Sequence, residues 1–252
     1  MATVTSQDGA KIGFDKVGFG PAVILVNGAM SFRAMDPTLA QLAELLGAHF
    51  TVYNYDRRGR GESGDTKPFA KEREIEDIKA LVKDAGGQAM LFGISSGGAV
   101  ALEAAAALSG VPNVVVYEVP FIVDDSRPPL KDYKGYTSRL VADGKLDELV
   151  EYFSTAVAGM PAEFVGGMKQ DQALWGGMMA IAPTIPYDAA FVGKFMEGKP
   201  LPSDHWAKVT MPVLVADALA KVLPNASRQT LAGQTHMVDP NALSPVMIEF
   251  LK

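Results

Sequence analysis

Short apolar runs alternate along the chain with longer segments whose apolar residues recur at helical spacing, which predicts buried strands between amphipathic helices. The strands are expected at residues 2–6, 11–17, 22–26, 50–55, 89–92, 114–117, 212–216 and 228–231. The helices are expected at about residues 37–46, 72–85, 97–108 and 240–251. Because alternating strands and helices favour parallel pairing, we predict an α/β fold. Its mostly parallel central sheet of about eight strands would be flanked by helices.

Residues 121–205 break this alternation, since prolines and glycine pairs recur there and no apolar run predicts a strand. Helical pieces are expected at 131–142, 145–158 and 163–179. We interpret 121–205 as a helical cap (lid) inserted into a core that consists of residues 1–120 and 206–252. The segment is rich in methionine and aromatic residues. Most of these must pack its own interior, and a few are expected to line an apolar pocket.

The clearest chemical signal is a serine at a sharp turn between a strand and a helix. The segment Gly93-Ile94-Ser95-Ser96-Gly97 follows the apolar run 89–92 and precedes an alanine-rich helix. Gly93 and Gly97 are needed because larger side chains would collide where strand and helix meet so closely. Ser95 is thereby displayed beside the positive end of a helix dipole. This setting favours a serine that attacks a carbonyl group.

Three other motifs follow predicted strands. They are Asn27-Gly28-Ala29, the run Tyr55-Asp-Arg-Arg-Gly-Arg-Gly-Glu-Ser63, and Gly233-Gln-Thr-His236. Because ligands of such sheets bind beyond the carboxyl ends of the strands, Gly28, Asp56, Ser95 and Glu118 are expected at one site. Together with the serine turn and the cap, these motifs make the chain resemble the α/β-hydrolase family over nearly its whole length.

The resemblance implies a catalytic triad of serine, histidine and an acid. It identifies Ser95 as the nucleophile and His236 as its base, with the backbone amides of Ala29 and Ser96 as the oxyanion hole. Where many members have His-Gly, this chain has Asn27-Gly28, a change that leaves the backbone contribution intact.

The acid of the triad is where the chain departs from the family. Most members carry the acid in a loop after the seventh strand, but here only residues 217–226 separate the last two strands. A crossover this short is at the lower limit for a strand–helix–strand connection. Glu118, after the sixth strand, and Asp217, after the seventh, both remain candidates. We favour Glu118 because a carboxylate among apolar residues needs a partner, whereas Asp217 can cap the shortened helix.

Arg57, Arg58 and Arg60 form a cluster that could bind a phosphate. We instead expect a structural turn with internal ion pairs, because that is the role the family resemblance implies for this run.

Composition narrows the partners and cofactors. The 252 residues include no cysteine, which excludes disulfides and thiolate metal sites, and neither a metal nor a cofactor is expected. A net charge of −6 argues against nucleic acid as a partner. No apolar run reaches the ~18 residues that span a membrane, and the N-terminus lacks the pattern of a signal peptide. We expect a cytoplasmic monomer or homodimer.

These features predict a carboxylesterase-like serine hydrolase. It would cleave a small-to-medium ester, thioester or lactone with an apolar part through an acyl-enzyme. The alternatives are a cofactor-free perhydrolase or C–C hydrolase, and a non-catalytic or weakly active ligand-binding protein on the same scaffold. The catalytic and non-catalytic alternatives differ in whether Glu118 or Asp217 can form a hydrogen bond with His236. The predicted substrate contacts are Met30, Phe121, Trp175, Met178 and Met237.

Overall fold

The structure, a computed structural model, describes residues 2–125, 127–215 and 218–252, with only the backbone for residue 218. These residues form two compact units. The first contains the chain up to Pro120 together with Leu201–Lys252, and the second is Phe121–Pro200. The second unit therefore lies within the segment 121–205 for which a cap is predicted. That it acts as a cap stays a prediction.

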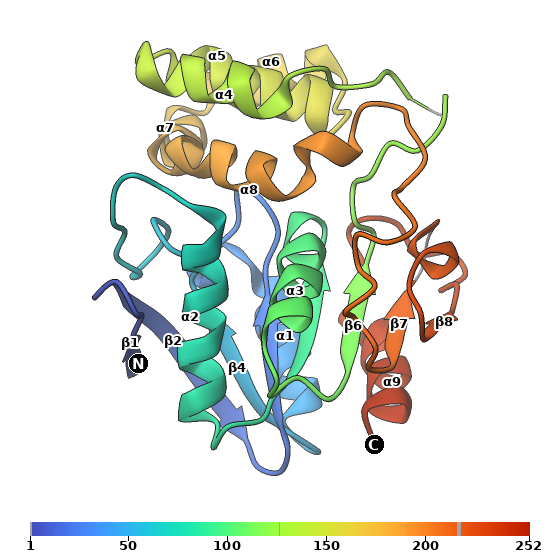
Figure 1. The fold of residues 1–252 in the computed structure, drawn as a ribbon. Helices are drawn as coiled ribbons and strands as arrows, with labels where there is room; N and C mark the ends of the chain where they lie inside the picture. The colour runs from blue at the N-terminus through green and yellow to red at the C-terminus, as the bar shows by residue number, and fades with distance from the viewer. Residues whose placement is uncertain (1, 126, 216–217) are drawn as a thin grey trace. The chain divides into compact units, whose positions relative to one another are not determined.

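The first unit is built on an eight-stranded sheet in the order β1-β2-β4-β3-β5-β6-β7-β8 (Figure 1). The strands are β1 Ala2–Thr5, β2 Lys11–Gly18, β3 Ala22–Val26, β4 Thr51–Tyr55, β5 Met90–Ile94, β6 Val114–Tyr117, β7 Val213–Val215 and β8 Ala226–Arg228. The pairs β1–β2 and β2–β4 are antiparallel, and the other pairs are parallel. The prediction of an α/β fold with a mostly parallel sheet is confirmed.

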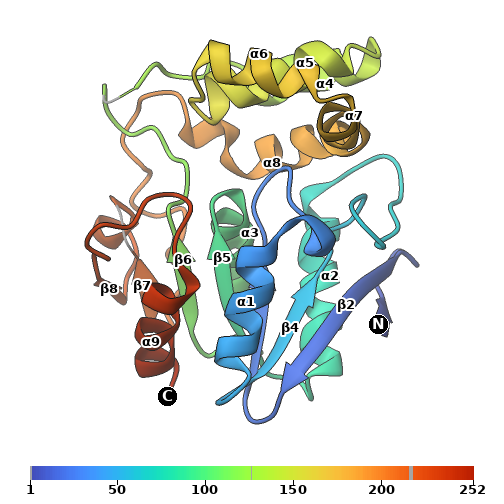
Figure 2. The same cartoon turned by 180° about the vertical axis from the view of Figure 1, so that it is seen from behind.

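Helices cover both faces of this sheet. Figure 1 shows α2 (Lys71–Asp84) and α3 (Ser96–Ala107) in front of the strands, and Figure 2 shows α1 (Pro37–Leu46) and α9 (Pro240–Leu251) on the opposite face. Leu39, Leu42 and Leu46 recur at helical spacing in α1 and are all buried against the sheet side of the core. The apolar periodicity of the sequence thus sets which face of the helix is buried.

The second unit is helical over its described residues. Its α-helices are α4 Tyr133–Ala142, α5 Leu146–Tyr152, α6 Ala162–Gln170, α7 Gln172–Ile181 and α8 Ile185–Val192, and α5 runs on into a π-helical turn at Phe153–Val157. The prediction of one helical piece over 163–179 is wrong, because the Asp171 side chain accepts the amides of Ala173 and Leu174 and starts a new helix. The sequence also misses α8, whose Pro186 lies in the first turn, where no backbone N–H is needed.

The last strand is displaced from its predicted position at 228–231. β8 pairs with β7 from Val213↔Ala226 to Val215↔Arg228, so it begins as soon as the short connection allows. The described part of that connection contains a 3-10 helix at Ala218–Lys221 rather than a longer α-helix. Asp217 lies outside the described residues.

The turn from β5 into α3 requires glycine at positions 93 and 97. A Cβ added to Gly97 would lie 2.2 Å from the carbonyl oxygen of Val26 and 2.4 Å from that of Asn27. A Cβ added to Gly93 would lie 2.5 Å from the carbonyl oxygen of Gly97. These are backbone atoms that cannot move aside, so glycine is required for α3 to approach β3 and β5 this closely.

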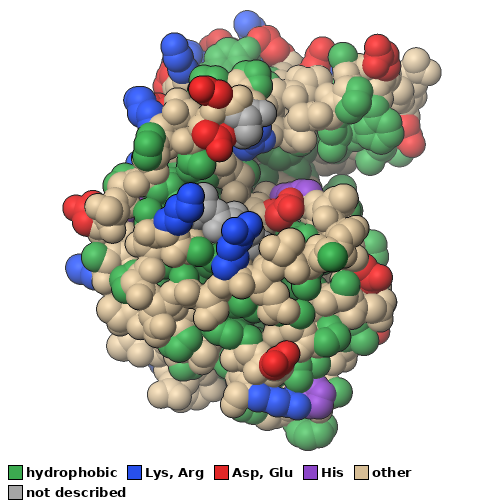
Figure 3. All heavy atoms as spheres, turned by 90° about the vertical axis from the view of Figure 1, so that its right-hand side faces the viewer, with side chains coloured by type: hydrophobic (Ala, Val, Ile, Leu, Met, Phe, Trp, Pro, Cys, Tyr) green, Lys and Arg blue, Asp and Glu red, His purple; other side chains and the backbone are tan. Residues whose placement is uncertain are grey.

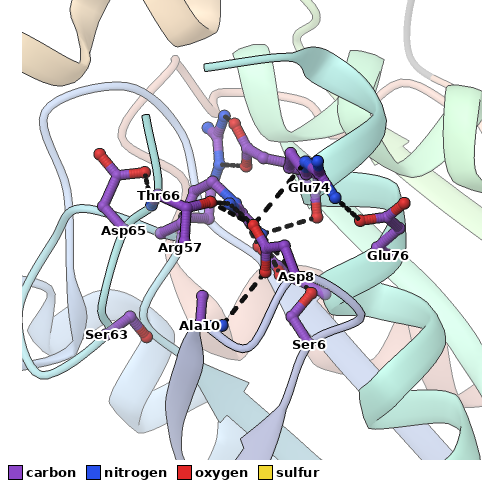
Figure 4. Close-up of polar contacts among 12 residues, drawn as sticks. Ser6, Asp8, Ala10, Arg57, Ser63, Asp65, Thr66, Glu74 and Glu76 are labelled. Atoms are coloured by element: carbon purple, nitrogen blue, oxygen red, sulfur yellow. Dashed lines mark hydrogen bonds and ion pairs between the residues drawn. The ribbon is translucent and has the colours of Figure 1, made fainter. Parts of the chain in front are cut away.

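Arg58 joins the N-terminal hairpin to α2. Its buried guanidinium donates to Asp8 at 2.8 Å and forms a fork on Asp77 with distances of 2.9 and 2.6 Å. Figure 4 shows Asp8 among its polar partners, which include the amide of Ala10 and the hydroxyl of Thr66. Arg58 and these donors hold the pKa of Asp8 well below its ordinary value.

The neighbouring Arg57 is also internally paired, with Glu74 at 2.6 and 2.7 Å (Figure 4). The arginine cluster therefore forms the structural turn with internal ion pairs that the sequence analysis predicts.

We predict that Gly97→Ala lowers the free energy of unfolding by about 3 kcal/mol or more, because the added methyl group collides with backbone. Gly176→Ala in α7 is the matched control, since a Cβ there meets nothing within 4 Å. The control is expected to be neutral or to stabilise the protein by about 0.5–1 kcal/mol. Urea unfolding of both variants measures the difference. Equal effects would contradict this account of the turn.

The lowered pKa of Asp8 predicts a pH-dependent contribution to stability. The folded state favours the ionised carboxylate, so its contribution is complete above the ordinary pKa of 3.8 and is lost as the pH falls below that value. Asp8→Asn should therefore lower the unfolding free energy by about 1–3 kcal/mol at pH 7. The difference from wild type should shrink below pH 4. A difference that stays constant between pH 7 and pH 3 would rule out the ion pair as its source.

Candidate active site

Backbone strain gathers at the carboxyl ends of three neighbouring strands. Met30, Ser95 and Glu118, which lie beyond β3, β5 and β6, have φ angles of 56°, 55° and 47°. One other non-glycine residue in the described chain has a positive φ, Asp132 in the second unit. Strain of this kind costs about 1–3 kcal/mol per residue and persists where the surroundings impose it, often at functional sites. The three residues mark one edge of the sheet as the candidate active site.

Ser95 sits at the tip of the β5–α3 turn. Its ψ angle is −131°, outside the helical range, and Ser96 is the first residue of α3. The Ser95 amide donates to the carbonyl of Tyr117 at 2.9 Å, and the Ser95 carbonyl accepts the amide of Gly98 at 2.9 Å. The backbone is thus fixed on both sides, while the side chain stays half-buried and the amide of Ser96 lies at the positive end of a helix.

The loop after β3 lies directly against this serine. A Cβ added to Gly28 would lie 3.1 Å from Cβ of Ser95 and 3.6 Å from its Oγ. Glycine therefore allows the loop Asn27-Gly28-Ala29 to approach the nucleophile. Ala29, which the sequence analysis assigns to the oxyanion hole, is the next residue and is half-buried.

The guanidinium groups of two buried arginines donate to the backbone carbonyls of this loop. Arg60 Nη1 donates to the carbonyl of Gly28 at 2.7 Å, and Arg57 Nη1 donates to that of Asn27 at 3.3 Å. Charge-assisted bonds in a buried setting are stronger than neutral ones. The sequence predicts a structural turn here, but nothing in its spacing reveals that the turn supports this loop.

Asp56 fixes the farther end of the same loop. Its carboxylate accepts the Arg33 amide at 2.8 Å, the Arg33 guanidinium at 3.1 Å and the amide of Glu62 at 2.9 Å. The segment that follows Met30 is therefore fixed at Arg33 by these hydrogen bonds.

His236 meets Glu118 at the same edge of the sheet. Nδ1 of the imidazole lies 3.1 Å from Oε2 of Glu118, and the two side chains retain 52% and 42% of their accessible surface. The structure thus brings the favoured acid to the histidine. A carboxylate at Nδ1 selects the neutral tautomer that carries its proton there and leaves Nε2 as an acceptor.

His236 lies in the loop of residues 229–239 between β8 and α9, which we call the histidine loop. The sequence does not predict that Tyr117 contacts this loop. The apolar run of β6 identifies Tyr117 only as part of a buried strand. In the structure its hydroxyl donates to the carbonyl of Thr235, the residue before His236, at 2.8 Å.

The predicted substrate contacts are divided between the two units. Met30 and Met237 lie in the first, and Met237 beside His236 is 77% exposed. Phe121, Trp175 and Met178 lie in the second unit. There Trp175 and Met178 are buried, the Trp175 indole donates to Asp147 at 2.8 Å, and Phe121 packs against Phe195 with ring centroids 4.9 Å apart. Their predicted contact with substrate stays a prediction.

Two other kinds of feature are metal sites and membrane-spanning helices. The described residues contain no group of three or more His, Asp or Glu side chains arranged to hold a metal ion. Within the same ranges, no helix combines the length and apolar character needed to cross a membrane. Figure 3 shows one face of the molecule, on which basic and acidic side chains are scattered among apolar ones.

Known proteins resemble this chain over most or all of its length. The model of the alpha/beta hydrolase family matches residues 23–244. An alpha/beta hydrolase from Sphaerobacter thermophilus is 44% identical, with 100% of both chains covered and a TM-score of 0.87.

Two more distant structures share the fold. An enol-lactonase from Burkholderia xenovorans is 17% identical, with 99% of each chain covered and a TM-score of 0.70. A thermophilic esterase from Thermogutta terrifontis is 22% identical, with 99% of this chain and 97% of that one covered and a TM-score of 0.66. The extent of the family match and the 44% identity over the full length show that this chain belongs to the alpha/beta hydrolase family.

Proposed function

We propose that the protein is a carboxylesterase-like serine hydrolase that cleaves a small-to-medium ester, thioester or lactone through an acyl-enzyme on Ser95. The observation that carries the proposal is the hydrogen-bond contact of His236 with Glu118. This contact lies at the carboxyl ends of the strands, where Ser95 occupies a strained turn. Membership of a hydrolase family supports it.

In the proposed mechanism, His236 Nε2 takes the hydroxyl proton of Ser95 while Oγ attacks the substrate carbonyl. The negative charge that develops on the carbonyl oxygen is stabilised by the amides of Ala29 and Ser96, at about 3–4 kcal/mol for one such donor. The tetrahedral intermediate then expels the alcohol or thiol, which receives its proton from His236. Water, activated by the same imidazole, releases the acid and restores Ser95.

Glu118 would act through the imidazole rather than on the substrate. Its hydrogen bond keeps the proton on Nδ1 in the resting enzyme and stabilises the imidazolium that forms during attack. The contact also bears on the non-catalytic alternative, which would follow if no carboxylate reached His236. The 3.1 Å contact of Glu118 favours the catalytic alternative.

The substrate class is supported by side-chain chemistry and by the neighbours. Met30 follows Ala29 of the proposed oxyanion hole in sequence, and Met237 follows His236. Flexible thioether side chains suit an adaptable apolar binding surface. The enol-lactonase and the esterase share only the fold with this chain, but both are named for the cleavage of acyl–oxygen bonds.

We predict stoichiometric labelling of Ser95 by a fluorophosphonate, because the reagent phosphonylates serines that a neighbouring base activates. Mass spectrometry of the digested protein locates the adduct. Ser95→Ala, and wild type unfolded before treatment, should both remain unlabelled. A folded wild-type protein without an adduct on Ser95 would overturn the proposed function.

We predict that Glu118→Gln lowers kcat with p-nitrophenyl acetate by about 100-fold or more with little change in KM, since the imidazole loses the partner that fixes its tautomer. Glu103→Gln is a matched control, because Glu103 lies in α3 past the Ser95 turn and contacts His205 at 2.7 Å, in a second carboxylate–imidazole pair that includes neither Glu118 nor His236. The control should retain wild-type kcat. If Glu118→Gln retains the kcat of wild type, the acid of the triad is another carboxylate, and Asp217 is the next to test.

A further inference from the structure

The contact between His236 and Glu118 is exposed to water, so it cannot by itself hold the loop that carries His236 in place. Both side chains remain about half accessible to water. Solvent-exposed ion pairs contribute little to stability, and salt screens them. A general base must nevertheless stay within hydrogen-bond reach of the proton it removes. The histidine loop therefore needs a second and more deeply buried attachment.

Tyr117 provides that attachment. Its side chain belongs to the buried core at 5% exposure, and its hydroxyl donates to the carbonyl of Thr235 at 2.8 Å. Two consecutive residues at the carboxyl end of β6 bond to two consecutive residues of the loop. Tyr117 bonds to Thr235, and Glu118 bonds to His236. Two adjacent attachments fix the direction of the loop as well as its position.

The backbone of Tyr117 also contacts the nucleophile turn. Its carbonyl accepts the amide of Ser95 at 2.9 Å. One residue thus bonds to the turn that carries Ser95 through its main chain and to the loop that carries His236 through its side chain. Glu118 follows it directly in sequence, so all three segments of the triad are connected at Tyr117.

The rest of the histidine loop is held at its ends. The amide of Gln234 donates to the carbonyl of Leu231 at 3.2 Å, and its side-chain oxygen accepts the amide of Asp239 at 2.8 Å. Asp239 in turn caps α9 by accepting the amide of Asn241. These bonds close the loop on itself and on α9, whereas the bond from Tyr117 attaches it to the sheet.

We propose that Tyr117 is a positioning residue that, through the Thr235 carbonyl, holds the loop so that His236 stays oriented toward Glu118, which fixes its tautomer. The inference rests on the proposed function for its catalytic consequence, but the hydrogen bond that carries it does not. Burial and the charge of Glu118 raise the pKa of the Tyr117 hydroxyl, so the group remains a donor at the pH of the assays.

Tyr117→Phe tests the proposal, because it removes the hydroxyl and keeps the ring that fills the core. A hydrogen bond contributes about 0.5–1.5 kcal/mol, so kcat with p-nitrophenyl acetate should fall about 2- to 13-fold while KM stays within twofold of wild type. The active sites are titrated with the fluorophosphonate, so that kcat refers to folded protein alone.

Tyr53→Phe is the matched control. Tyr53 lies in β4 of the same sheet, is as buried as Tyr117, and donates its hydroxyl at 3.1 Å to Asp84, the last residue of α2. It should leave kcat unchanged even if it costs stability. A merely structural effect of losing a buried hydroxyl would appear equally in both variants.

A second readout does not depend on catalysis. ¹⁵N NMR of the histidine rings, with the His236 signals identified by their loss in His236→Gln, reports which nitrogen carries the proton. Wild type should hold His236 in the Nδ1–H form, and Tyr117→Phe should populate the Nε2–H form. Wild-type kcat together with a wild-type tautomer in Tyr117→Phe would overturn the proposal. Failure of wild type to label or to hydrolyse the ester would instead overturn the proposed function, and the NMR comparison would still decide the role of Tyr117.

Discussion

The approach of α3 to the ends of β3 and β5 is the constraint on which the candidate site depends. Gly97 leaves no space between the helix and the carbonyls of Val26 and Asn27, so the chain can enter the helix only through a strained serine. The central apolar strands β3, β5 and β6, which are almost completely buried, supply the packing that sustains this strain. Had the turn relaxed, Ser95 would adopt ordinary backbone angles and lose its position against Gly28.

The polar network beneath the loop after β3 serves the same end. Buried charges are unfavourable unless they are paired, and Arg57 and Arg60 satisfy this requirement by donating to backbone carbonyls and, for Arg57, to Glu74. Groups that stabilise developing charge act best when they are already in place before the reaction. A loop whose carbonyls are fixed by guanidinium groups has its amides fixed as well. An internal ion-pair cluster thus contributes to the candidate site through the backbone of this loop.

Much of this arrangement could be predicted from the sequence because it follows from local rules. Apolar runs predicted the strands, and the glycines around Ser95 predicted the turn. Contacts between distant segments were harder. The break between α6 and α7 depends on the Asp171 side chain, which caps the start of α7. The early start of β8 depends on its pairing with β7. The apolar periodicity of the sequence encodes neither contact. The hydrogen bonds of Arg60 to Gly28 and of Tyr117 to Thr235 join residues far apart in sequence. A single chain carries no local signal for them.

The central claim is that Ser95 is a nucleophile served by a preformed oxyanion hole and by the His236–Glu118 pair. A crystal structure of the protein after reaction with a fluorophosphonate tests it most directly. The account predicts phosphorus bonded to Ser95 Oγ, with one phosphonyl oxygen about 2.7–3.1 Å from the amides of Ala29 and Ser96. It also predicts that the His236–Glu118 hydrogen bond is retained. An adduct on another residue, or one on Ser95 whose oxygens meet neither amide, would contradict it.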